Sequence, residues 1–405
     1  MFDKTLSIIM AGGIGKRLHP LTADRAKPAV PFGGKYRIID FTLTNCLHSK
    51  LRRILVLTQY KSQSLQKHLL DGWTIFSPEI AEYIMHVPPQ MRTGESWYTG
   101  TADAIFQNIY LIERSNPNNI LILSGDHIYR MDYAAMIRFH REQKAQLTIA
   151  CMDVPIAEAS AFGIMSVDDA YRISEFHEKP QNPQAMPDNP DRALASMGIY
   201  IFERNLLCSA LQDDHDLAES SHDFGKDIIP KLINTHRVCA YRFGGELGRV
   251  TQDRYWRDVG TIDSYYAANM DLVAPVPPMN LYQPDWPIRT YHGQNPPARM
   301  VSGPSGQAGQ LLNSLLSSGT VICGGHVRHS VLSPHVQVDE NAVVEDTILF
   351  EGVHVGAGAH LTRCIVDKNV KIPPGERIGF DHAADANRFT VSDSGITVVP
   401  KGYRF

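Results

Sequence analysis

The sequence lacks the features that mark membrane, disulfide-rich and nucleic-acid-binding proteins. No apolar run approaches the roughly 18 residues that a membrane-spanning helix needs. The six cysteines are scattered without a Cys-x-x-Cys pair, which favours buried reduced thiols over a zinc site or a disulfide framework. The net charge of −4 does not favour a nucleic-acid partner, and the N-terminus has no signal-peptide pattern. We therefore expect a cytoplasmic protein that binds neither membranes nor nucleic acids.

The composition is otherwise that of an ordinary globular protein. The 405 residues are 43% hydrophobic and 20% charged, which is enough chain for two or three domains. Strand-like and helical patterns alternate over the first two-thirds. The expected strands are 6–10, 54–57, 120–123, 147–150 and 198–202, and the expected helices include 101–114 and 132–144. This alternation predicts a Rossmann-like α/β fold with a mostly parallel sheet, whose ligands bind beyond the carboxyl ends of the strands.

Two changes in pattern divide the chain. The stretch APVPPMNLYQPDWP contains five prolines and ends the alternation, so we predict a connecting segment over 273–319. From about residue 320, apolar residues recur every six positions, as at Val321 and Val327. Such repeats predict a parallel β-helix over 320–405, separate from the α/β domain over 1–272. Because the register slips, a small irregular β-sandwich is the alternative.

The stretch AGGIGKRLHPLTADRAKPAVP (11–31) directly follows the first expected strand. A glycine turn behind a strand lets backbone N–H groups approach a polyanion closely. The usual phosphate loops do not fit, because Arg17 replaces the Ser/Thr of a P-loop and Leu18 replaces the third glycine of a dinucleotide fingerprint. The basic residues that follow are Lys16, Arg17, Arg25 and Lys27. The loop predicts a phosphate-binding edge; a tight turn with solvated basic residues is the alternative.

Three further positions carry candidate chemistry. Asp126 follows the strand 120–123 beside a glycine, and Asp258 lies in the segment YWRDVG. Two carboxylates on separate loops can share one Mg²⁺, which prefers oxygen ligands and substrate phosphates. Lys179 ends the segment EFHEKP and suits a terminal phosphate. Taken singly, each of these residues is also explained as a turn aspartate or an exposed lysine.

Taken together, these segments resemble the glucose-1-phosphate adenylyltransferase family of sugar-nucleotide pyrophosphorylases. They occur in one order as GGIGKRL, RAKP, TQY (58–60), SWYTGTADA (96–104), GDHIY, EFHEKP, SMGIY, SHDFGKD (221–227) and YWRDVGT. The resemblance covers nearly the whole chain. It implies a nucleotidyltransferase catalytic domain over 1–272 and a left-handed parallel β-helix over 320–405 that serves regulation and oligomerisation.

The resemblance also implies a reaction, the committed step of bacterial glycogen synthesis. ATP and α-D-glucose 1-phosphate give ADP-glucose and pyrophosphate, with Mg²⁺ as cofactor. The sugar phosphate attacks the α-phosphorus in line without a covalent intermediate, so catalysis consists of positioning and charge neutralisation.

The resemblance assigns roles to particular residues. The catalytic residues would be Asp126, Arg17 and Lys27, with Asp126 and Asp258 as metal ligands. The nucleotide would contact Gly12, Gly13, Gln59 and Gly100. Glucose 1-phosphate would contact Tyr98, Gly163, Glu178, Lys179, Ser196, Asp223 and Trp256.

The family is a homotetramer in bacteria and responds to phosphorylated metabolites and adenine nucleotides. The resemblance places its effector site between the two domains, where Arg25 and Arg37 match two of the family's basic residues and Lys368 or Arg363 could supply a C-terminal one. Asp24 stands where relatives activated by fructose bisphosphate carry a basic residue. An acid there should repel a bisphosphate, so we expect a different or weaker activator.

Three alternatives remain beside this hypothesis. A guanylyl- or uridylyltransferase would share the glycine loop, Asp126 and Lys179, but not SWYTGTADA together with HDFGKD. A non-catalytic regulatory subunit would have lost phosphate- or metal-holding residues that this chain retains. A bifunctional enzyme with an acyltransferase β-helix is disfavoured because the repeat region is short.

Overall fold

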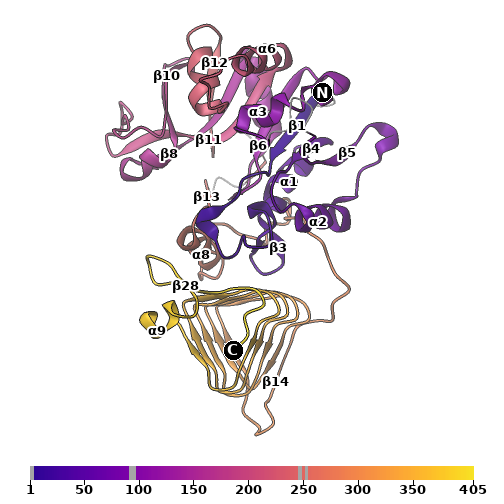
Figure 1. The fold of residues 1–405 in the computed structure, drawn as a ribbon, viewed down its shortest axis with the longest axis vertical. Coiled ribbons are helices and arrows are strands. Elements are labelled where there is room, and N and C mark those ends of the chain that lie inside the picture. The colour runs from indigo at the N-terminus through magenta and orange to yellow at the C-terminus, as the bar shows by residue number, and fades with distance from the viewer. Residues whose placement is uncertain (1–3, 91–96, 245–248, 251–253) are drawn as a thin grey trace.

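The computed structural model describes residues 4–90, 97–244, 249–250 and 254–405. It consists of an α/β domain and a β-helix, which are joined by one extended segment along the outside (Figure 1). The first residue of the SWYTGTADA motif, Ser96, lies outside the described residues. Within the described part of the chain, no helix is long and apolar enough to cross a membrane.

The α/β domain is built on one mixed sheet of nine strands. Its parallel part has the order β6-β1-β4-β5, with bounds Asn119–Ser124, Thr5–Met10, Arg53–Leu57 and Tyr83–Val87. The remaining strands are β8 (Leu147–Pro155), β9 (Gly163–Val167), β10 (Ile173–Glu178), β11 (Arg192–Glu203) and β12 (Val238–Arg242). The expected parallel strands are confirmed, but β11, expected over 198–202, is longer and antiparallel to both β6 and β8.

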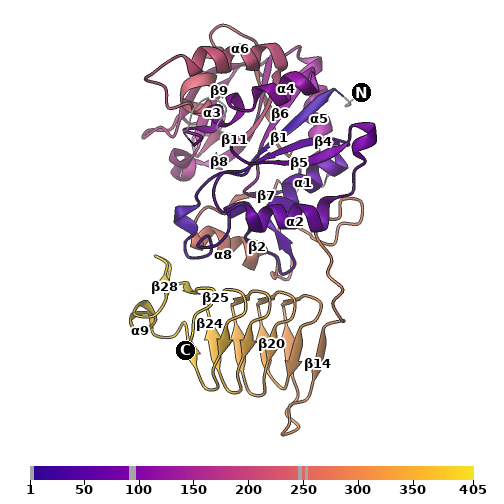
Figure 2. The ribbon, with the colours of Figure 1, turned by 45° about the vertical axis from the view of Figure 1, so that its right-hand side comes forward.

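Helices cover both faces of this sheet, as the alternating pattern predicts (Figure 2). Leu6 and Ile8 of β1 belong to one buried core, whereas Ile9 belongs to the core on the opposite face. The helices are α1 (Ile38–His48), α2 (Gln63–Trp73), α3 (Thr101–Phe106), α4 (Ile109–Ser115), α5 (Tyr133–Glu142), α6 (Arg204–His215), α7 (Ile229–Leu232) and α8 (Ile262–Asp271). The helix expected over 101–114 is therefore two helices, because the chain turns at Gln107 and Asn108.

Two small antiparallel sheets stand apart from the main sheet. One pairs β2 (Pro31–Phe32) with β3 (Tyr36–Arg37), close to the β-helix. The other pairs β7 (His127–Tyr129) with β13 (Trp256–Asp258) and opposes Asp258 directly to His127. This second pairing joins two segments that lie far apart in the sequence.

The C-terminal domain is a parallel β-helix of three sheets, and not a β-sandwich. The first sheet is β14 (Arg299–Val301), β17 (Val321–Cys323), β20 (Gln337–Val338), β23 (His354–Val355) and β26 (Lys371–Ile372). The second is β15 (Gln310–Leu312), β18 (His326–Arg328), β21 (Val343–Glu345), β24 (His360–Thr362) and β27 (Arg377–Ile378). The third is β16 (Leu315–Leu316), β19 (Val331–Leu332), β22 (Ile348–Leu349), β25 (Cys364–Val366), β29 (Thr397–Val399) and β28 (Thr390–Val391). The short helix α9 (His382–Ala386) follows β27.

The six-residue repeat has a direct structural reason. Val338 and Val344, six residues apart, lie on neighbouring sheets, and Ile322, Val338, Val355 and Ile372 stack in register as a buried column. The repeat expected at Val321 is therefore off by one residue, because Ile322 is the inward-facing side chain there. The first coil, β14 to β16, falls within 273–319, the stretch that the sequence pattern assigns to a connection. Prolines and glycines around 296–309 interrupt the repeat there, and the strand β15 is exposed.

One apolar core spans both domains. It includes Tyr265 of α8 together with Phe350, Ile365 and Val398 of the β-helix. The α/β domain therefore rests on one side of the β-helix over a packed surface (Figure 2).

Among the residues that the structure describes, two ion pairs cross the same interface. Arg25 Nη2 lies 2.9 Å from Asp367 Oδ1, and these side chains are only 5% and 2% exposed. The Arg25 guanidinium also lies 6.0 Å from the ring centre of Phe350. The second pair joins Lys401 to Asp24 at 3.4 Å, and both of its side chains are solvent-exposed. The two pairs thus differ mainly in burial.

A buried histidine should make the α/β domain sensitive to acid. Burial, aided by the charge of Arg141, lowers the pKa of His140 to about 4, while Nδ1 lies 2.8 Å from the Thr148 hydroxyl. Between this pKa and the ordinary value the unfolded chain binds more protons, so stability falls as pH falls. We expect His140 to lower the free energy of unfolding by about 1 kcal/mol when the pH falls from about 7.5 to about 5.5. Urea unfolding at both pH values should show a smaller loss in His140→Asn; an equal loss would contradict the assignment.

Candidate active site

A cavity of about 680 Å³ opens beyond the carboxyl ends of the parallel strands β1, β4 and β6. The predicted residues that line it are Gly12, Gly13, Arg17, Lys27, Gln59, Tyr98, Gly100, Asp126 and Asp223. The sequence prediction of a ligand site at this edge therefore agrees with the position of the cavity.

The glycine loop leads from β1 into this cavity. Gly15 has φ 64°, in the left-handed region that favours glycine, and it precedes the short 3₁₀ helix Lys16–Leu18. A Cβ at Gly12 would lie 3.1 Å from Gln59 Cβ, so glycine keeps the β1 and β4 loops close together. By contrast, a Cβ at Gly13 would meet nothing within 4 Å, so protein packing does not explain that glycine.

Three charged residues meet at one end of the cavity. Lys27 Nζ lies 2.9 Å from Asp126 Oδ2 and 2.9 Å from Asp258 Oδ1. Asp126 follows β6, while the pairing of β13 with β7 brings Asp258 from the other end of the α/β domain. Sequence spacing alone does not show that these carboxylates meet.

The local charges determine the protonation of this centre. Burial tends to raise the pKa of Asp126, but Lys27, His127 and the Ser124 hydroxyl outweigh it and hold this pKa well below its usual range. Burial tends to lower the pKa of Lys27, but Asp126 and Asp258 outweigh it and raise this pKa. Both groups are therefore charged at neutral pH.

The same carboxylates fit a divalent cation. The Lys27 ammonium already lies where an oxygen of each aspartate converges, which shows that the two side chains can share one positive charge. Asp126, His127 and Asp258 each offer a ligand atom, and these atoms lie within 4.8 Å of one another. Since Mg²⁺ prefers oxygen, the two carboxylates suit it better than the imidazole does.

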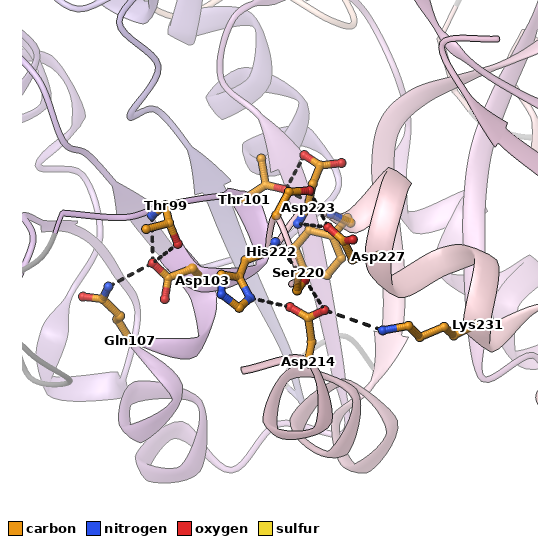
Figure 3. Close-up of polar contacts among 12 residues, drawn as sticks. Thr99, Thr101, Asp103, Gln107, Asp214, Ser220, His222, Asp223, Asp227 and Lys231 are labelled. Carbon is orange, nitrogen blue, oxygen red and sulfur yellow. Dashed lines mark hydrogen bonds and ion pairs between the residues drawn. The ribbon is translucent and has the colours of Figure 1, made fainter. Parts of the chain in front are cut away.

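A hydrogen-bonded network holds another wall of the cavity, which includes Thr99, Thr101 and Asp223 (Figure 3). The buried Asp103 of α3 accepts bonds from the N–H and hydroxyl of Thr99, and from Gln107. Thr101 Oγ1 donates to Asp223 Oδ2 at 3.1 Å. Asp223 in turn caps the helical segment η5 (Phe224–Ile228) through the N–H groups of residues 225 and 226. The wall is therefore held by its own polar contacts.

Of the predicted sugar-phosphate residues, Tyr98 and Asp223 line this cavity, whereas four line neither it nor the neighbouring cavity described below, namely Gly163, Glu178, Lys179 and Ser196. Gly163 pairs with Glu178, and the Glu178 carboxylate lies 2.9 Å from Lys179 Nζ. Lys179 is 61% exposed at its side chain. Ser196 lies in β11, where its hydroxyl accepts a bond from the Gly198 N–H.

Trp256 and Asp258 belong to a second cavity. They line a space of about 420 Å³ that shares Gly260 with the first cavity. The ring of Trp256 contacts His127, with centroids 4.7 Å apart. The two cavities therefore meet near the paired aspartates.

The predicted effector residues separate into two environments. Arg37 and Lys368 line a cavity of about 290 Å³ between the domains, together with Lys35 and Glu351. Burial lowers the pKa of both Lys35 and Lys368, although Glu351 at 2.6 Å partly offsets it for Lys368. Arg25 is not among the residues that line this cavity, and it is buried against Asp367.

The sequence reasoning missed several residues of the site. Thr101, Ser124 and Lys226 also line the first cavity, as does Lys16, which the sequence analysis had placed at the phosphate-binding edge. Lys226 and Thr101 lie inside the HDFGKD and SWYTGTADA motifs, so the motifs themselves carried the signal.

Comparison with known proteins identifies the family of this chain. The family model described as nucleotidyl transferase matches residues 6–274, and the model described as GlmU-like, C-terminal hexapeptide matches residues 296–399. The chain is therefore a nucleotidyl transferase with a hexapeptide β-helix. The second match begins before residue 299, so it includes the first coil.

Full-length relatives narrow this class. The chain is 60% identical to glucose-1-phosphate adenylyltransferase 2 of Vibrio cholerae, over 99% of this chain and 98% of the relative. It is 50% identical to glucose-1-phosphate adenylyltransferase of Nitrosospira multiformis, over 98% of this chain and 93% of the relative. It is 49% identical to glucose-1-phosphate adenylyltransferase of Rhodopirellula baltica, over 99% of this chain and 91% of the relative. The protein belongs to the glucose-1-phosphate adenylyltransferase family, and the sequence-based assignment is confirmed.

Proposed function

We propose that this protein transfers the adenylyl group of ATP to α-D-glucose 1-phosphate, forming ADP-glucose and pyrophosphate. The observation that carries the proposal is the cavity beyond β1, β4 and β6, where a glycine loop and paired carboxylates meet. Relatives with 60% identity over nearly the full length bear the name of this activity.

The glycine loop suits the triphosphate. An oxygen of the sugar phosphate attacks the α-phosphorus, one P–O bond forms, and the bond to pyrophosphate breaks. Arg17 and Lys27 would neutralise charge on the triphosphate, and the open space beside Gly13 would admit a phosphate close to the backbone. Arg17 and Lys27 thus supply positioning and charge without an enzyme nucleophile.

Asp126 and Asp258 would hold Mg²⁺. When bound there, the ion would supply positive charge that offsets the charge developing on the phosphates. Lys27 and the ion would compete for the same carboxylate oxygens, so we assign Lys27 to phosphate in the substrate complex.

The remaining roles fall partly on residues that line the two cavities and partly on residues outside them. Gln59, beside Gly12 and bonded to the Tyr98 carbonyl, would contact the adenine, and Gly100 would lie close to the nucleotide. Glucose 1-phosphate would bind as the second substrate. Its contacts would be Tyr98, Gly163, Glu178, Lys179, Ser196, Asp223 and Trp256.

The cavity between the domains is our proposed effector site. Arg37, Lys35 and Lys368 are cations whose pKa burial lowers, so an anionic phosphate would stabilise their charged forms. Arg25 would act from the domain interface rather than from the cavity wall. A homotetramer in the cytoplasm remains the expected form of the enzyme.

A nucleotide panel tests the proposed function. We expect ATP to exceed UTP, GTP and CTP by about 10²-fold in kcat/KM with glucose 1-phosphate, because a polar base pocket rejects mismatched bases. Product formation is measured as released pyrophosphate and identified by chromatography. Preference for UTP or GTP would replace the proposal with the corresponding uridylyl- or guanylyltransferase. Absence of turnover with all four would indicate a regulatory subunit.

A further inference from the structure

A buried carboxylate outside the cavity, Asp214, holds the turn that forms one of its walls (Figure 3). Asp214 lies in the last turn of α6, and its side chain is 4% exposed. It accepts hydrogen bonds from His222 Nδ1 at 2.8 Å and from Ser220 Oγ at 2.7 Å. The N–H of His222 donates to the same Ser220 hydroxyl at 3.0 Å. One carboxylate therefore ties both side chains of the turn to the helix.

The backbone of His222 needs this support. Its φ is 52°, in the left-handed region that residues other than glycine adopt uncommonly, although histidine and asparagine do so more often than most. This conformation directs the His222 carbonyl toward α3, where it accepts the N–H of Ala102 at 2.8 Å. Because the conformation is unfavourable by itself, the contacts to Asp214 and Ser220 help to maintain it.

The turn is in direct backbone contact with the nucleotide side of the cavity. A Cβ at Gly100 would lie only 2.2 Å from the His222 carbonyl oxygen. Thr101 Oγ1 donates to Asp223 and accepts the Phe224 N–H at 3.1 Å. A shift of the turn would therefore displace Gly100 and Thr101, which line the cavity.

The same turn also contacts the sugar side. A Cβ at Gly225 would lie 2.4 Å from Glu178 Oε2, so Glu178 packs against the turn. Ser221 and Asp223 themselves line the first cavity. Segment 220–225 thus lies between the residues proposed for ATP and those proposed for glucose 1-phosphate.

We propose that Asp214 is a positioning residue which, through His222, sets the relative placement of the two substrates. This inference rests on the proposed function for its kinetic consequence only. Asp214 touches neither cavity, so its effect would pass through segment 220–225.

Kinetics of Asp214→Asn and of the matched variant Asp213→Asn test the proposal. Asp213 is the exposed neighbour on the same helix, so its variant makes the same charge change without the contacts. We expect Asp214→Asn to raise the KM for ATP or for glucose 1-phosphate about tenfold. Asp213→Asn should leave both KM values unchanged. Misfolding lowers the active fraction and hence apparent kcat, but it does not change KM. An apparent loss of kcat with both KM values unchanged would overturn the proposal.

Variants of His222 separate the tether from general packing. Asparagine tolerates the left-handed conformation, and its amide can donate to Asp214. We therefore expect His222→Asn to keep KM near the wild-type value and His222→Ala to resemble Asp214→Asn. Equal KM values in the two His222 variants would contradict the tether.

Hydrogen exchange supplies a readout independent of catalysis. In Asp214→Asn, amides of peptides covering 99–104 and 220–227 should exchange about tenfold faster, with no change in Asp213→Asn. If the wild-type protein makes no ADP-glucose, the proposed function fails, yet the exchange result still decides whether Asp214 holds the turn. Unchanged exchange in both peptides would overturn the proposal.

Discussion

Asp126→Asn is expected to lower kcat for ADP-glucose formation by about 10³-fold or more. The substitution removes half of the carboxylate pair that would hold the metal, and Asp258 alone lacks the converging second oxygen. Because asparagine is nearly isosteric with aspartate, we expect the substitution to leave the shape of the site unchanged. Initial rates at saturating ATP and glucose 1-phosphate measure the effect.

Direct metal binding distinguishes this role from a loss of folded protein. Mn²⁺ used as a paramagnetic probe should bind the wild-type protein and Asp213→Asn equally, and Asp126→Asn much more weakly. The low pKa of Asp126 means that its carboxylate remains charged through the neutral range, so this difference should persist from weakly acidic to alkaline pH. Turnover within tenfold of wild type, with metal binding intact, would refute the assignment.

Asp367→Asn should lower the free energy of unfolding by about 3–5 kcal/mol, because it leaves the buried Arg25 charge without its partner. The exposed pair Lys401–Asp24 crosses the same domain interface, so Lys401→Met is the matched control. That change should cost less than about 1 kcal/mol, since exposed pairs contribute little. Urea unfolding of both variants, followed by tryptophan fluorescence, measures the difference.

The same comparison tests whether burial determines the strength of these pairs. Equal destabilisation in the Asp367 and Lys401 variants would contradict the structural argument. Because Arg25 lies two residues before Lys27, the loss of Asp367 should also disturb the loop that carries Lys27 into the cavity. Only two residues of backbone therefore separate the domain interface at Arg25 from the proposed triphosphate site at Lys27.

Local sequence patterns were sufficient for much of the fold. The run ending at Met10 and the glycines behind it predict a strand followed by a phosphate-binding turn, and both features depend on neighbouring residues. The six-residue repeat predicts the β-helix because one period builds one side of a coil. The first coil escaped this reasoning because prolines and glycines interrupt its period.

The local sequence pattern also did not predict the antiparallel direction of β11. An apolar run such as Gly198–Phe202 predicts a strand, but the direction of that strand depends on where the preceding β9 and β10 lead the chain. Likewise, the helical pattern over 101–114 does not reveal the turn at Asn108, which bonds to the Ala104 carbonyl and the Tyr98 hydroxyl. These bonds reach residues only four and ten positions earlier, but a helical spacing of apolar residues does not encode them.

Short sequence motifs contain the glycine loop, its basic residues and each aspartate of the site. This is because close phosphate approach and metal binding require particular residue types. The motifs do not show, however, that these residues lie close together in the fold. Asp126 and Asp258 come together through the β7–β13 pairing, and Arg25 meets Asp367 across 342 positions. Asp214 carries no motif at all; only the left-handed turn at His222 and its contact with Gly100 reveal what it holds. Such pairings depend on how distant segments pack, and packing is a property of the whole folded chain.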